Sequence, residues 1–128
     1  MTNHAARPIA VIIEPRATLA DTIAEALGRR GYDVVVVTTH VGGATAALKC
    51  HQVDFLVAAV PAPGEDRSGA YLAQARAQNP RMKTVIMLSD PDEDIRGAPR
   101  HAVQLVKPFT LGELNLALDQ ADARHRSP

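Results

Sequence analysis

Three polar residues directly follow apolar runs that are typical of buried β-strands. They are Glu14 after residues 9–13, Ser89 after residues 85–88, and Lys107 after residues 102–106. A carboxylate, a hydroxyl and an ammonium at the carboxyl edge of a parallel sheet are suited to binding, because doubly wound sheets form their crevice there. No nucleophile, base and orienting group fall together anywhere in the pattern. We therefore expect a binding site and no enzyme.

The elements that would position these residues alternate between strand-like and helix-like apolar patterns. This alternation is typical of a parallel sheet wrapped by helices. We expect strands at residues 9–13, 34–37, 55–60, 84–88 and 102–106. We expect helices from Thr18 to before Gly31, at about 43–50, at about 68–78, and from Thr110 to about 121. Thr18 with Asp21, and Thr110 with Glu113, are predicted capping boxes, in which a side chain at each end bonds the other's backbone N–H.

The fourth helix is predicted to be short. The segment between Ser89 and Lys107 is polar and contains Pro91, Gly97 and Pro99. It has room for about one or two helical turns, at residues 92–96. The sequence thus predicts a single (βα)5 doubly wound domain over residues 1–128. Its ordered core spans about 7–122, with tails at 1–6 and 123–128.

Composition narrows the classes of function. The chain has 128 residues, 46% of them apolar, which is enough for one domain with a real core. Its 14 basic and 14 acidic residues balance, so neither nucleic acid nor a membrane surface is an expected partner. No apolar run reaches the roughly 20 residues of a membrane helix, and no export signal is visible. With the single Cys50, this pattern predicts a cytoplasmic protein. The five histidines fit no metal-ligand spacing, and we expect no metal site.

The triplet Lys107-Pro108-Phe109 stands in register with Ser89, Pro63-Gly64 and Gly31-Tyr32. Together these residues resemble the receiver domain of bacterial response regulators, of the chemotaxis-regulator type, over about residues 7–121. The resemblance implies a flavodoxin-like five-stranded fold and a place in two-component signalling. It implies that Ser89 matches the hydroxyl that senses a phosphoryl group and that Lys107 matches the invariant lysine. It also implies a cis peptide bond before Pro108.

The sequence departs from that family where the family does its chemistry. Two acids end the first strand of receivers and hold magnesium, whereas here the pair is Glu14-Pro15. Asp54 matches an acid at the start of the third strand, but the phosphorylated aspartate is replaced by Ala59. A methyl group cannot act as a nucleophile, and one carboxylate is a poor magnesium site. The resemblance therefore implies a degenerate receiver without phosphotransfer, and with magnesium binding lost or very weak.

The family's partner for Lys107 is missing, and an unpaired half-buried ammonium would be costly. We expect a replacement ion pair with Glu14. The rival interpretation is that Lys107 and Ser89 bind an anion, which Glu14 would oppose. Three residues before the lysine, receivers carry an aromatic side chain that moves inward on activation. That position is Gln104, so we expect the usual switch to be disabled.

These observations predict an atypical receiver domain that signals through phosphorylation-independent protein–protein contacts. The expected partner is a histidine kinase, another regulator or an output protein, and a homodimer is possible. Two alternatives stay open. One is a pseudo-receiver that binds a small ligand or nucleotide, although no glycine-rich loop follows Glu14. The other is a phosphorelay receiver with an unusual acceptor, Asp90 or Ser89.

Overall fold

The structure is a computed structural model of the whole chain, and it describes residues 8–38, 53–60, 77, 81–89 and 102–126. The helices expected near 43–50 and 92–96 lie outside the described residues, and so does the helix near 68–78 apart from the helical Ala77. The shortened fourth helix and the N-terminal tail therefore remain sequence-based expectations.

Within the described residues, five parallel strands form one sheet in the order β2-β1-β3-β4-β5. The strands are β1 Ile9–Ile13, β2 Asp33–Thr38, β3 Phe55–Val60, β4 Lys83–Leu88 and β5 Val103–Val106. This strand order is that of flavodoxin-like doubly wound folds. Each strand lies within one residue of its predicted bounds, because short apolar runs bounded by polar residues are strong local signals.

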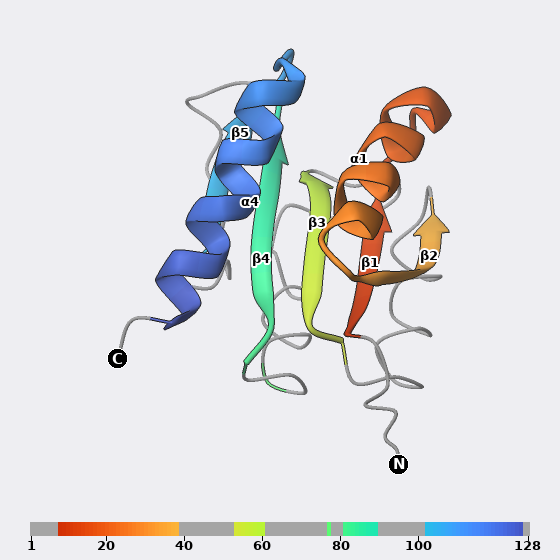
Figure 1. Cartoon of the computed structure of the whole chain (residues 1–128). Coiled ribbons are helices and arrows are strands. Elements are labelled where there is room, and N and C mark those ends of the chain that lie inside the picture. Colours follow the sequence, from red (N-terminus) through yellow and green to blue (C-terminus); the bar gives the residue numbers. More distant parts are fainter. Residues whose placement is uncertain (1–7, 39–52, 61–76, 78–80, 90–101, 127–128) are drawn as a thin grey trace.

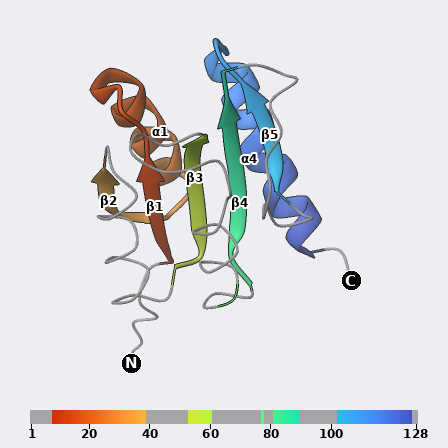
Figure 2. The ribbon, with the colours of Figure 1, turned by 180° about the vertical axis from the view of Figure 1, so that it is seen from behind.

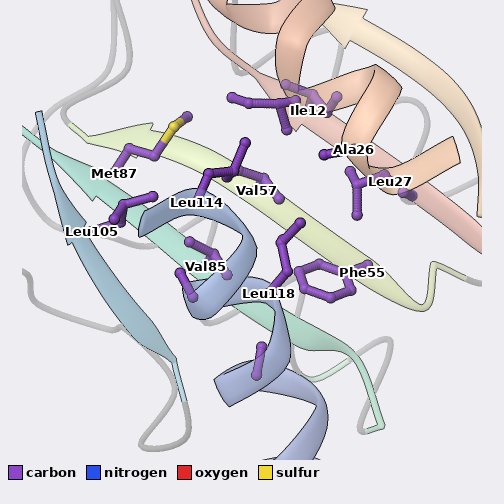
Figure 3. Close-up of a cluster of buried hydrophobic side chains, with 14 of the residues drawn as sticks. Ile12, Ala26, Leu27, Phe55, Val57, Val85, Met87, Leu105, Leu114 and Leu118 are labelled. Carbon is purple, nitrogen blue, oxygen red and sulfur yellow. The ribbon is translucent and has the colours of Figure 1, made fainter. Parts of the chain in front are cut away.

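Two helices, α1 Ala17–Arg29 and α4 Leu111–Arg126, cover the same face of the sheet (Figure 1). Figure 2 shows the sheet from the other side, with both helices behind it. Alternate strand residues, among them Ile12, Val57, Val85 and Leu105, pack in one apolar cluster with Leu27 of α1 and with Leu114 and Leu118 of α4 (Figure 3). We call this side the helix-covered face.

The opposite face of the sheet is buried over its three central strands. Six residues of β1, β3 and β4 on that face have no exposed surface: Val11, Ile13, Leu56, Ala58, Ile86 and Leu88. Burial on both faces explains why the strands appear in the sequence as continuous apolar runs without polar alternation.

The start of α1 corrects one prediction. The N-cap is Arg16, which makes no side-chain cap hydrogen bond, so Thr18 and Asp21 do not form the predicted capping box. The chain turns into the helix directly after β1, and Thr18 is already inside the first turn. Its carbonyl accepts a hydrogen bond from the Thr22 hydroxyl at 3.1 Å. The helix ends at Arg29, and Gly31, two residues later, has a φ of +92° that favours glycine.

The last helix matches its predicted start and differs at its end. Thr110 Oγ1 accepts from the N–H of Glu113 at 3.1 Å, and the Glu113 carboxylate accepts from the N–H of Thr110 at 2.8 Å, which confirms the capping box. α4 continues to Arg126, into the segment 123–128 that was expected to be a tail. Side-chain contacts of Asp119 and Asp122 hold this end of the helix. Leu111, the first residue of α4, is 53% exposed.

Candidate functional site

The candidate site lies at the carboxyl edge of the sheet, where the strand arrows of Figure 1 end and where α1 and α4 begin. Four residues of the helix-covered face stand near the ends of their strands: Ile12, Val57, Met87 and Leu105. Two positions further along an extended chain a residue returns to the same face. Those positions are Glu14, Ala59, Ser89 and Lys107. Because side chains alternate along a strand, these four positions fall on the helix-covered side of the carboxyl edge.

Glu14 and Lys107 form the ion pair expected from the sequence. Lys107 Nζ donates to Glu14 Oε1 at 2.5 Å, and the second carboxylate oxygen accepts from the backbone N–H of Arg16 at 2.8 Å. The Glu14 side chain has no exposed surface, whereas the Lys107 side chain is 19% exposed. A buried carboxylate needs a donor at each oxygen. The pair and the N–H of Arg16 together meet that need.

The segment after β5 holds Lys107 in place. The backbone N–H of Lys107 donates to the carbonyl of Leu88 at 2.7 Å, which continues the contact between β4 and β5 past the strand end. The Lys107–Pro108 peptide bond is cis, the isomer expected from the resemblance. Phe109 is partly buried and packs against the apolar cluster. The lysine is thus fixed from its backbone as well as from its ammonium group.

Ala59 is built into the apolar core. It is 6% exposed and lies beside Met87 in the β3–β4 pairing. Asp54, the acid five residues earlier, is at the opposite edge, where its carboxylate accepts from the N–H of Ile9 at 2.9 Å. Asp54 therefore cannot stand in for a carboxylate at the end of β3.

The donor set does not fit a magnesium ion. Both oxygens of Glu14 are occupied, Pro15 is exposed and has no side-chain oxygen, and Ala59 has none either. Among the described residues, no group of three or more His, Cys, Asp or Glu side chains is placed to hold a metal. Asp66 and Asp90 lie outside the described residues. No step that depends on a metal is therefore assigned to this edge.

The remaining predicted site residues are exposed. Ser89 is at the surface beside Lys107, and Gln104 points to solvent from β5, on the face away from Leu105. Ser89 and Lys107 line a cavity of about 740 Å³. The rest of its described lining is Arg16, Thr18, Leu19, Thr22, Pro108 and Phe109.

The α1 residues of this cavity were not among the site residues predicted from the sequence. One signal for them was present, since Thr18 and Thr22 are spaced i, i+4 and so share one face of a helix that begins at the correct edge. The side chain of Arg16 had no comparable signal. The position of this side chain depends on where α1 starts. The predicted capping box put that start at Thr18, whereas the N-cap is Arg16.

A scan against protein-family models finds no match, and no curated protein is similar at the sequence level. Solved structures are similar in fold. A response regulator receiver protein from Sinorhizobium medicae WSM419 has a TM-score of 0.77 at 21% identity, covering 92% of this chain and 97% of that one. The signal receiver domain of an HD domain-containing protein from Pseudomonas fluorescens Pf-5 has a TM-score of 0.74 at 23% identity, covering 98% and 94%.

A CheY-like response regulator receiver domain protein from Methanospirillum hungatei JF-1 is similar to the same degree, with a TM-score of 0.74 at 17% identity over 94% of this chain and 98% of that one. At these identities the likeness shows the fold, which is the receiver fold. In the described part of the chain, no helix has the length and hydrophobicity needed to span a membrane.

Proposed function

We propose that this chain is a receiver-type signalling domain that accepts no phosphoryl group and acts through protein–protein contacts. The observation that carries the proposal is the end of β3. Ala59 stands there on the same side of the sheet as Lys107, and the lysine is paired with Glu14. The fold supports the receiver assignment, and the side chains at its edge support the loss of phosphotransfer.

Phosphorylation of a receiver would need two things that the described residues of this edge do not provide. A carboxylate oxygen must attack phosphorus and form an acyl phosphate while the donor's leaving group departs, and Ala59 has no such oxygen. Hard oxygen ligands must also hold magnesium against the phosphoryl group. Among the described residues of this edge only Glu14 has a carboxylate, and its two oxygens already accept hydrogen bonds.

The proposed output does not depend on a two-state switch of the usual kind. The Glu14–Lys107 pair gives the pocket one stable arrangement without any ligand, since each charge neutralises the other. Gln104 is exposed on β5, so no aromatic side chain occupies that position to report on the pocket. A histidine kinase, another regulator or an output protein would bind this constant surface, and a second copy of the chain is a further candidate.

Intact-mass analysis after incubation with acetyl phosphate and magnesium tests the loss of phosphotransfer. We expect no added phosphoryl group on the wild-type protein. Ala59→Asp alone should also stay unlabelled, because Pro15 still provides no magnesium ligand. The double variant Pro15→Asp/Ala59→Asp restores both carboxylates and is the positive control. Labelling of the wild-type chain would refute the proposal, and peptide mapping would then show whether Ser89 or Asp90 is the acceptor.

A pull-down with the whole chain as bait tests the output. Wild type and Ala59→Asp should capture the same partner in similar amounts if the binding surface is independent of the pocket. Loss of the partner in Ala59→Asp alone would show that the pocket controls the binding surface, and the constant-surface part of the proposal would then be wrong.

A further inference from the structure

We propose that the cavity between α1 and the segment after β5 binds a small organic anion, and that Arg16 provides its principal charge. The ligand class is a carboxylate or phosphate ester joined to an apolar or aromatic group. Binding at Arg16 requires neither phosphotransfer nor a protein partner, so it goes beyond the signalling role proposed above.

The size and lining of the cavity suit such a ligand. Its volume of about 740 Å³ falls within the range of small-molecule sites. Its described lining includes side chains with donor groups, namely Arg16, Thr18, Ser89 and Lys107. It also includes apolar side chains, namely Leu19, Pro108 and Phe109, which we call the apolar wall. No carboxylate is among its described lining residues. The cavity therefore offers hydrogen-bond donors and an apolar wall to the same molecule.

The charge of the cavity favours an anion. Within the part of the chain that the structure describes, the Arg16 guanidinium makes no ion pair or hydrogen bond, and its residue is exposed. A guanidinium presents a planar fork of N–H donors that matches carboxylate and phosphate oxygens. An incoming anion would thus meet a cation that has no partner to give up among the described residues.

Lys107 adds to this charge without leaving Glu14. An ammonium has three N–H donors, and one of them is directed to Glu14 Oε1. Arg16 and Lys107 carry two positive charges and Glu14 one negative charge, which leaves the group with one net positive charge. Glu14 has no exposed surface, and its oxygens are already hydrogen-bonded, so its carboxylate does not face the cavity. The ion pair and the ligand are therefore compatible.

The apolar wall selects an organic anion over an inorganic one. Phe109 is held by its packing against the core, and Leu19 is held by α1. An aromatic or aliphatic group that covers them removes apolar surface from water, which bare phosphate cannot do. We therefore expect phenyl phosphate to bind more tightly than inorganic phosphate. Benzyl alcohol has an aromatic group without the charge, so it should bind more weakly than phenyl phosphate or benzoate.

The test is an NMR titration of the full chain at low salt with phenyl phosphate, benzoate, inorganic phosphate and benzyl alcohol. Saturable shifts of the amides of Thr18 and Ser89 are expected with phenyl phosphate, at a dissociation constant of about 1 mM for a ligand of this size. Arg16→Gln should weaken binding by about tenfold. Arg29→Gln is the matched control, because it removes the same charge from the exposed far end of α1 and should leave the affinity unchanged.

Three results would overturn the site. The first is no saturable shift up to about 20 mM phenyl phosphate. The second is equal affinity for wild type and Arg16→Gln, and the third is equal affinity for phenyl phosphate and benzyl alcohol. Equal binding of phenyl phosphate and inorganic phosphate would refute the role of the apolar wall. None of these results bears on acetyl phosphate labelling, so the two proposals can fail separately.

Discussion

Glu14 and Lys107 form a buried ion pair although 93 positions separate them in the chain. The two partners are not equivalent, since the carboxylate is fully shielded and the ammonium side chain keeps 19% of its surface exposed. The pair joins the residues that follow β1 and β5, the first and last strands in the chain. The contribution of this pair to the free energy of unfolding is therefore the first quantity to measure.

We expect Lys107→Met to lower the free energy of unfolding by about 3 kcal/mol, because it leaves a fully buried carboxylate without its cation. Glu14→Gln should cost less, since the ammonium can turn to solvent on its flexible stem. The double variant should recover part of the loss of Lys107→Met. Urea denaturation measures all three, and equal losses in the two single variants would contradict the asymmetry.

The two helix starts give a second prediction. Thr110→Ala should lower the free energy of unfolding by about 1 kcal/mol, because it removes the side-chain cap of α4. Thr18→Ala is the matched control, and its effect should be clearly smaller, since α1 has no side-chain cap. Thermal and urea denaturation of both variants test this. A larger loss in Thr18→Ala would restore the capping box predicted from the sequence.

Asp54 provides a third prediction at the opposite edge of the sheet. Its carboxylate accepts from the N–H of Ile9, so Asp54→Ala should cost about 1–2 kcal/mol of stability. It should leave the titration with phenyl phosphate unchanged, because Asp54 is remote from the cavity. A changed affinity in a variant that still folds would show that the two edges are coupled.

Lys83 joins the start of β4 to the end of α4. Its ammonium donates to Asp122 at 2.6 Å and to the Tyr32 hydroxyl at 3.0 Å, and Arg30 contacts Asp119 at 2.7 Å next to it. Burial alone would lower the pKa of Lys83, but the hydrogen bonds to Asp122 and Tyr32 outweigh it. The pKa is therefore raised above 10.5.

The raised pKa of Lys83 gives an alkaline prediction. The charged form of Lys83 stabilises the folded state, because its pKa is higher there than in the unfolded chain. This stabilisation is complete below the unfolded pKa of 10.5 and is lost as the pH rises through the folded pKa. The melting-temperature advantage of wild type over Lys83→Met should therefore shrink as the pH rises through the range above 10.5. A constant advantage across that range would contradict the assignment.

Local patterns in the sequence were sufficient for the sheet. Short apolar runs, such as residues 9–13 and 55–60, have strand bounds that depend on neighbouring residues alone, and the observed strands agree with them. The same holds for the cap of α4, which Thr110 and Glu113 form within four residues. The start of α1 was mispredicted because Thr18 and Asp21 have the correct spacing, while the direction of the chain after β1 decides where the helix begins.

Two features of the site followed from the sequence without any structure. The third strand carries Ala59, which has no carboxylate, near its end, and Glu14, Ser89 and Lys107 each follow the end of a strand. Both are local features, because side chains alternate along a strand with a period of two and a polar residue marks the end of an apolar run. Only the tertiary structure decided that α4 extends to Arg126, that both oxygens of Glu14 are occupied, and that Arg16 and Phe109 line one cavity. These facts depend on the distances between elements far apart in the chain. Packing sets such distances, and no short stretch of sequence contains them.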